Sequence, residues 1–259
     1  MTRYSFIPLF LIAALSLAFI YPPSAEEPAP TARPGKQTNG IAVAELFTSQ
    51  GCSSCPPADR VLAELRDRAA RTGEPIHVFS FHVDYWNYLG WVDPFSSPYF
   101  SARQTDYTDR LNVRTYTPQL VINGTTELIG SRREEVTAVI DRALAEPARD
   151  YGLEFSAVRS GTTVRVTYSV SEPASHLRAV ALLVDERAES RVTRGENRGR
   201  TLVHVNVVRD LEGADAGAKG ELELMVPEDA SAELSVAVML QAEDLSIHSI
   251  RSRAVIQVP

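Results

Sequence analysis

The chain has 259 residues, with 26 Lys or Arg against 33 Asp or Glu and a formal net charge of −7. An acidic chain without basic runs lacks the electrostatic footprint that nucleic-acid binding requires, which excludes nucleic acid as a partner. Roughly 220 residues follow position 39, enough for one large domain or two small ones.

Residues 1–25 have the order of a secretory signal: a basic start at Arg3, an apolar stretch over 6–20 and an exit rich in small residues. The apolar stretch is shorter than the roughly 20 residues that a spanning helix needs. We expect cleavage after Ala25 and a secreted or periplasmic protein without a stable membrane span. An uncleaved signal would instead be an N-terminal membrane anchor. Residues 26–39, rich in Pro and Ala, predict a flexible leader.

Helical periodicity alternates with short apolar runs between residues 40 and 150. Nearly continuous apolar runs predict strands that are covered on both faces. Asn123-Gly124, placed between two such runs, is a strong hairpin signal. The order β-α-β-α-β-β-α predicts one α/β sandwich domain over 40–150. Its elements are expected at 41–48, 58–69, 75–83, 97–111, 119–130 (a hairpin) and 131–146.

The pattern changes after Pro147. About six stretches with alternating apolar residues and no helix between them predict a small all-β sandwich over 151–259. The segment 185–200 holds five arginines and four acids, is close to neutral, and is expected to be a solvated loop. We therefore place the domain boundary at 147–151.

The only two cysteines, Cys52 and Cys55, stand between a predicted strand and a predicted helix. They could be a redox pair, two metal ligands or a structural staple. The dipole and free N–H groups at a helix N-terminus stabilise a thiolate, and the spacing allows a disulfide. We expect Cys52 to be the exposed, attacking thiol and Cys55 to be the shielded, resolving thiol.

Thr117-Pro118 stands just before the hairpin. The order strand, CxxC, helix, strand, helix, Thr-Pro, hairpin and helix resembles the thioredoxin fold, in which a Thr-Pro with a cis bond faces the cysteines. The resemblance implies a redox-active disulfide Cys52–Cys55 with no other cofactor, and protein or peptide thiols and disulfides as partners. It also implies that Glu45, offset by one position, is a proton relay. An Arg-paired Glu45 is the alternative, because an unpaired buried carboxylate is costly.

Five stretches carry a narrower resemblance: "ELFTSQGCSSCPPAD", "FHVDYWNYLGWVDPFSSP", "RQTDYT", "YTPQLVING" and "GENRGRTLVHVNVVRDL". Over about residues 41–259 the chain is similar to the exported bacterial family catalogued as domain of unknown function 1223. That family implies a thioredoxin-like fold but has no established activity. Ser53-Ser54 replaces the Gly-Pro of strongly reducing thioredoxins, so their redox potential does not carry over.

The aromatic segment 81–100 follows the second strand. His82 and Asp84 should lie at the same sheet edge as Cys52, because parallel strands share one carboxyl edge. We expect Trp86, with Thr117 and Pro118, to bind a substrate peptide; the alternative is a packed loop.

Two other functions remain open at this point. In one, Cys52, Cys55 and His82 bind copper or zinc. In the other, the chain is a non-catalytic binding module with a structural disulfide.

Overall fold

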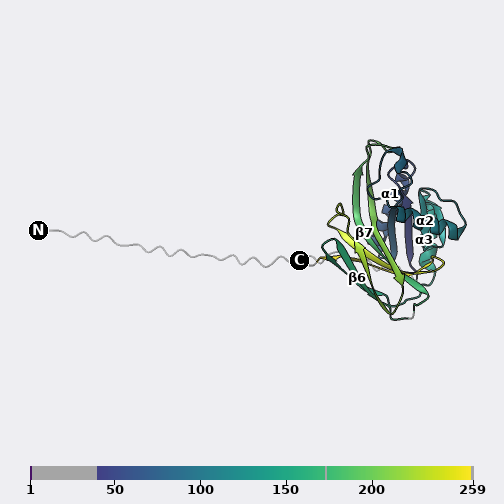
Figure 1. Cartoon of the computed structure of the whole chain (residues 1–259), viewed down its shortest axis with the longest axis vertical. Helices are drawn as coiled ribbons and strands as arrows, with labels where there is room; N and C mark the ends of the chain where they lie inside the picture. The colour runs from purple at the N-terminus through teal and green to yellow at the C-terminus, as the bar shows by residue number, and fades with distance from the viewer. Residues whose placement is uncertain (2–39, 173, 258–259) are drawn as a thin grey trace. The chain divides into compact units, whose positions relative to one another are not determined.

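The structure is a computed structural model that describes residue 1, residues 40–172 and residues 174–257 (Figure 1). The signal expected over 1–25 and the leader expected over 26–39 lie outside the described residues, apart from Met1. The described residues from 40 onward belong to one compact unit. Within them, no helix has both the length and the apolar character needed to cross a membrane.

The elements between residues 42 and 145 follow the predicted order, and strands follow from residue 154 onward. The helices are α1 (Pro56–Thr72), a short 3-10 helix η1 (Asn87–Leu89), α2 (Pro98–Leu111) and α3 (Arg133–Ala145). The strands are β1 (Ala42–Thr48), β2 (Ile76–His82), β3 (Gln119–Ile122), β4 (Thr126–Ile129), β5 (Glu154–Ser160), β6 (Thr163–Ser169), β7 (Leu177–Arg191), β8 (Thr201–Asp215), β9 (Lys219–Met225), β10 (Leu234–Ala242), β11 (Ile247–Ala254) and β12 (Ile256–Gln257).

Local sequence fixes where the first two long helices begin. Both α1 and α2 start with proline, whose fixed φ suits the first helical turn and whose missing N–H would lack a helical partner there. The Ser97 side chain caps α2 by accepting a hydrogen bond from the Tyr99 N–H. Helix α1 ends at Gly73, which adopts the left-handed φ of 70° that glycine tolerates. Cys55 is therefore the last residue before α1.

Eight strands form one mixed sheet in the order β11-β10-β7-β8-β2-β1-β3-β4. Strands β1 and β2 are parallel, and Thr48 lies opposite His82 where both end. Strand β8 joins the other edge of β2 through one bridge, Ser80 to Val207. Both β1 and β2 are covered on both faces, as their apolar runs predict. The sheet thus brings the ends of β1 and β2 next to β8.

The predicted fold class, a thioredoxin-like α/β domain followed by a separate small sandwich, is wrong. The strands β7, β8, β10 and β11 extend the sheet that contains β1–β4, so the molecule is mostly β (Figure 1). Hydrophobic periodicity identifies strands but not the strands with which they pair. One core spans both halves of the chain, with Val43, Phe79, Phe100, Leu182, Val208, Met239 and Ile250 among its members.

A second sheet of four strands has the order β12-β5-β6-β9. Its inner side chains pack with those of β7 and β10 into a further core that includes Phe155, Val166, Leu183, Leu224 and Val238. The strands after residue 150 therefore do sandwich a core. However, one of the two layers is the long sheet that they share with β1–β4.

Candidate functional site

The two cysteines form a disulfide immediately after β1. The chain leaves β1 at Thr48 and turns, with the Cys52 N–H donating to the Ser49 carbonyl over 3.2 Å. The Cys55 N–H donates to the Cys52 carbonyl over 3.3 Å, and the two Cα atoms are 5.5 Å apart. The predicted location between a strand and a helix is confirmed.

The exposure expected for Cys52 is wrong. Both cysteines are fully buried, and only Ser53 and Ser54 of the CxxC turn are exposed. The start of α1 also offers little to a thiolate. Pro56 and the proline after it have no N–H, and the next two N–H groups both donate to the Cys55 carbonyl.

A side chain supplies a hydrogen-bond donor to sulfur in place of the missing helix N–H groups. The Ser54 hydroxyl lies 3.2 Å from Cys52 Sγ, and the hydroxyl is the donor because a disulfide sulfur carries no proton.

Trp86, Thr117 and Pro118, the predicted substrate-binding residues, lie together. The Trp86 indole N–H donates to the Thr117 hydroxyl over 2.8 Å, and the bond between Thr117 and Pro118 is cis, as expected. A β-carbon added to Gly51, next to Cys52, would lie 3.1 Å from Trp86 Cβ. Trp86 therefore connects the CxxC turn to the Thr-Pro segment.

Glu45, the predicted proton relay, is paired on the other face of the sheet. Its neighbours in the strand, Ala44 and Leu46, pack with α1, whereas Glu45 is directed to α2. There Arg103 lies 2.9 Å from its carboxylate, and the Tyr107 hydroxyl donates to it. The Arg-paired arrangement left open from the sequence is the one present. No hydrogen-bond partner described for Glu45 belongs to the CxxC turn or to α1.

Burial has a strong effect on this group of side chains. It raises the pKa of the Tyr107 hydroxyl well above its usual value. Burial alone would lower the pKa of Arg103, but the Glu45 carboxylate, together with Tyr107 and Asp106, outweighs burial and the pKa is raised. Arg103 is therefore a permanent cation that neutralises Glu45.

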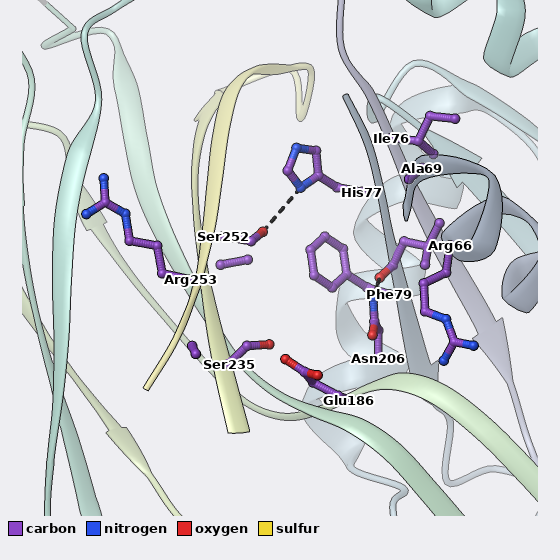
Figure 2. Close-up of a pocket in the computed structure, with 13 residues that line it drawn as sticks. Arg66, Ala69, Ile76, His77, Phe79, Glu186, Asn206, Ser235, Ser252 and Arg253 are labelled. Carbon is purple, nitrogen blue, oxygen red and sulfur yellow. Dashed lines mark hydrogen bonds between the residues drawn. The ribbon is translucent and has the colours of Figure 1, made fainter. Parts of the chain in front are cut away.

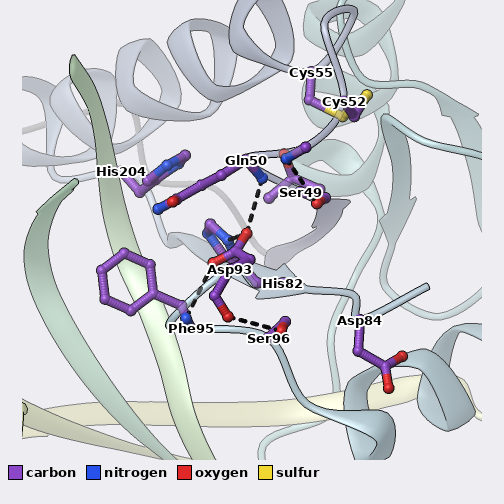
Figure 3. A network of polar contacts seen from close by, with 12 residues as sticks. Ser49, Gln50, Cys52, Cys55, His82, Asp84, Asp93, Phe95, Ser96 and His204 are labelled. Atoms are coloured by element: carbon purple, nitrogen blue, oxygen red, sulfur yellow. Dashed lines mark hydrogen bonds and ion pairs between the residues drawn. A yellow bond between two sulfur atoms is a disulfide. The ribbon is translucent and has the colours of Figure 1, made fainter. Parts of the chain in front are cut away.

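His82 is tied to the CxxC turn through a residue that the sequence did not single out. His82 is fully buried at the end of β2, and its Nδ1 lies 2.8 Å from Asp93 Oδ2. The same carboxylate oxygen accepts a hydrogen bond from the Gln50 N–H over 2.8 Å (Figure 3). Burial raises the pKa of Asp93, but His82 and two backbone N–H groups outweigh it, so the pKa lies below its usual value. Asp84, expected at the same sheet edge as Cys52, accepts a hydrogen bond from the Ser101 hydroxyl and has no described bond to His82.

A second histidine and a second carboxylate complete this group. His204, on β8, lies with its ring centre 4.5 Å from that of His82 and its plane nearly perpendicular. His204 Nδ1 is 3.6 Å from Asp59 Oδ2, and the other Asp59 oxygen accepts from the Thr48 hydroxyl over 2.9 Å. Burial lowers the pKa of His204, but attraction to Asp59, with a further contribution from Asp93, raises it above its usual value.

Asp59 sits in the first turn of α1, four residues after Cys55, so the two side chains share a face of the helix. Its place on the buried face of a helix was a signal in the sequence that we did not use. His204 could not be found this way, because nothing in an alternating strand pattern shows which other strand it will meet.

We call Thr48, Gln50, Ser80, His82, Asp59, Asp93 and His204 the polar layer. Within the described residues, several of its buried atoms have no hydrogen-bond partner: Gln50 Nε2, Ser80 Oγ, His82 Nε2 and both ring nitrogens of His204. Figure 3 shows Gln50 between the disulfide and Asp93. Among the described residues, no three His, Cys, Asp or Glu side chains are arranged to hold a metal ion, and copper or zinc on Cys52, Cys55 and His82 stays an untested alternative.

The segment 185–200, expected to be a solvated loop, is one only in part: residues 185–191 belong to β7, and the loop 192–200, although mostly exposed, binds the CxxC turn. Asn197, between β7 and β8, is fully buried. Its Nδ2 donates to the carbonyls of Gln50 over 2.9 Å and of Cys52 over 2.8 Å. Glu196 accepts from the Ser53 N–H over 2.9 Å. The prediction failed because charge balance describes the exposed arginines of the segment but not one buried amide.

A cavity of about 320 Å³ lies at the opposite end of β2 (Figure 2). There His77 Nδ1 lies 3.2 Å from the Ser252 hydroxyl of β11, and Glu186 and Arg253 contribute charges of opposite sign. Burial, with the Arg251 charge, lowers the pKa of His77 to about 4. Since β1 and β2 are parallel, the cavity and the disulfide lie at opposite ends of the strand pair and share no residue.

Comparisons with known proteins come from a family model and a solved structure. The model for DUF1223, a protein of unknown function, matches residues 43–241, and none of the curated proteins searched matches the chain. A crystal structure of protein AGR_C_4864 from Agrobacterium tumefaciens is similar, with a TM-score of 0.57, 24% identity, and coverage of 85% of this chain and 95% of that chain. At this identity the likeness shows the fold alone. Because the family model spans most of its length, the chain belongs to the DUF1223 family of proteins of unknown function.

Proposed function

We propose that this protein is an exported thiol–disulfide oxidoreductase that exchanges electrons with protein or peptide thiols through Cys52 and Cys55. The observation that carries the proposal is the polar layer beside a disulfide that closes a very short loop. Such a loop stabilises a fold by only about 2 kcal/mol in the chain-entropy model. Each buried polar atom without a hydrogen-bond partner destabilises the fold by a comparable amount. The arrangement therefore indicates a reactive site rather than a site that stabilises the fold.

The chemistry balances as a two-electron exchange. A partner thiolate attacks Cys52 Sγ, the bond between the sulfurs breaks, and Cys55 leaves as a thiolate with the electron pair. A second partner thiolate then attacks the mixed disulfide and releases Cys52. The partner dithiol is oxidised to a disulfide, and its two protons pass to the reduced protein.

The polar layer supports the departure of Cys55. Asp59 lies one helical turn from Cys55, and His204 lies beside Asp59. A raised pKa keeps His204 protonated closer to neutral pH, and its positive charge stabilises a thiolate that forms nearby. We assign proton exchange with Cys55 to Asp59 and His204 rather than to Glu45, whose partners lie on α2.

Trp86, Thr117 and Pro118 are proposed to bind the partner chain. The support is the indole–hydroxyl bond that holds Trp86 and Thr117 together next to the CxxC turn. Tyr88 and Val92, which follow Trp86, are largely exposed and offer apolar contacts beside it.

The test is exchange with a glutathione redox buffer and with insulin as a protein disulfide. The wild type should equilibrate between the disulfide and the dithiol and accelerate insulin reduction. Cys55→Ser should trap a mixed disulfide through Cys52, and Cys52→Ser should trap none. If no thiol–disulfide buffer reduces Cys52–Cys55 in the folded protein, the disulfide is structural and the proposal is wrong.

Export is part of the proposal, because stable disulfides belong to oxidising compartments. The expected mature protein begins at Glu26. The intact mass of protein from its native host checks this expectation, and retention of residues 1–25 would favour an anchor.

A further inference from the structure

The disulfide is buried, a loop from the other half of the chain binds the turn that holds it, and an exchange reaction needs a sulfur atom exposed. We call residues 192–200 the covering loop. It is a closed turn: the Gly199 N–H donates to the Val192 carbonyl over 2.8 Å, and the Val192 N–H donates to the Arg200 carbonyl over 2.9 Å. With Cys52 at zero exposure, a partner thiolate cannot reach its sulfur in this arrangement.

The hydrogen bonds between the covering loop and the CxxC turn join side chains of the loop to backbone groups of the turn. Asn197 donates to two carbonyls of the turn, and Arg200 Nη1 donates to Asn197 Oδ1 over 2.7 Å, which orients the amide. Glu196 accepts from the Ser53 N–H. Gly195 comes close to Gly51, since a β-carbon on Gly195 would lie 3.8 Å from Gly51 Cα. Each contact depends on the conformation of the turn.

Reduction changes that conformation and its charge. A disulfide holds its sulfurs about 2.05 Å apart, whereas two thiols separate to van der Waals contact and release the turn between them. A thiolate on Cys52 would also place a negative charge next to the residue whose N–H binds the Glu196 carboxylate. Both effects weaken the contacts of the covering loop.

We propose that Asn197 and Glu196 are positioning residues that make the covering loop bind the oxidised CxxC turn more tightly than the reduced turn, so that its release exposes Cys52 to a partner. Linkage makes this effect reciprocal. If oxidation increases the affinity of the loop for the turn by a given factor, the bound loop increases the equilibrium constant for disulfide formation by the same factor. The biological purpose rests on the proposed function, but the coupling itself can be measured with a small thiol.

The experiment uses the full chain and dithiothreitol, which gives two electrons and two protons to Cys52–Cys55 and becomes a cyclic disulfide. Asn197→Ala should increase the rate of reduction about tenfold, as expected for two lost hydrogen bonds, and shift the equilibrium with dithiothreitol toward the dithiol. Glu196→Gln should do the same by about threefold. Glu189→Gln, an exposed charge on β7 outside the loop, is the matched control and should change neither.

Trypsin provides a second readout, because Arg194, Arg198 and Arg200 of the covering loop are exposed. The reduced protein should be cut at these sites several times faster than the oxidised protein, while the exposed Arg132 serves as an internal reference. If Asn197→Ala does not fold, Glu196→Gln and wild-type proteolysis decide the question.

Equal cleavage in both redox states, with unchanged reduction of Glu196→Gln, would overturn the coupling. If the coupling is present but insulin and glutathione exchange are absent, the proposed function fails and this inference stands.

Discussion

The two faces of the β1–β2 strand pair each bury a group of polar side chains, and the two groups differ in how completely their polar atoms are hydrogen-bonded. On the α2 face, Glu45, Arg103, Tyr107 and Gln241 satisfy one another: Arg103 pairs with Glu45, and Gln241 donates to Tyr107 over 2.9 Å. On the α1 face, within the described residues, Gln50 Nε2, Ser80 Oγ and His82 Nε2 have no hydrogen-bond partner, and His204 Nδ1 lies 3.6 Å from Asp59, beyond hydrogen-bond distance. Complete pairing is what a structural role requires, whereas incomplete pairing beside a disulfide is expected of a reactive site.

The largest effect should come from breaking the paired group. Glu45→Gln leaves Arg103 as a buried cation without its carboxylate, which should lower the free energy of unfolding by about 3 kcal/mol. Urea denaturation measures this loss, and insulin reduction by the folded variant should stay near the wild-type rate. A stable variant with slow exchange would make Glu45 the relay after all.

The polar layer should respond to pH through His204. Its folded pKa is raised, so protonated His204 stabilises the fold fully below the unfolded pKa of about 6.5, and this contribution is lost as pH rises through the folded pKa. His204→Gln should remove that loss and slow exchange through Cys55 severalfold. Urea denaturation between pH 6 and 9 tests the first effect, and parallel pH profiles for variant and wild type would contradict it.

His77, in the cavity at the other end of β2, should make stability depend on pH in the opposite direction from His204. Its folded pKa of about 4 lies below the unfolded value, so its contribution to stability is present above pH 6.5 and is lost as pH falls toward 4. His77→Gln should reduce the acid sensitivity of the fold and leave exchange unchanged. Melting temperatures at pH 4.5 and 7 measure the difference between variant and wild type.

The smallest effect should come from Ser54→Ala in the reduced protein. Loss of the hydroxyl that donates to Cys52 Sγ should raise the pKa of the Cys52 thiol and slow its alkylation two- to threefold near pH 7. Ser53→Ala removes the neighbouring exposed hydroxyl and is the control. Equal alkylation rates in both variants would exclude Ser54 from the stabilisation of the thiolate.

Local sequence patterns predicted the local features. The element order up to α3 and the position of the cysteine pair follow from periodicity and short motifs within one segment, and the cis bond at Pro118 was implied by the resemblance to the thioredoxin fold. The joining of β8 to β2 could not be predicted in this way, because strand partners are chosen by packing across the whole chain. Asn197 and His204 were missed for the same reason, since they reach the site only through that pairing.

The contact between Asn197 and Cys52 joins residues 145 positions apart, and this separation sets an order of events during synthesis. At about 5–20 residues per second, Cys52 leaves the ribosome roughly 7–30 s before Asn197. In the proposed export the N-terminal part enters the oxidising compartment first, so Cys52 and Cys55 arrive there before the covering loop does. The chain can then acquire its disulfide first and bind the loop afterwards, which makes oxidation an early step of maturation and reduction a later, controlled one.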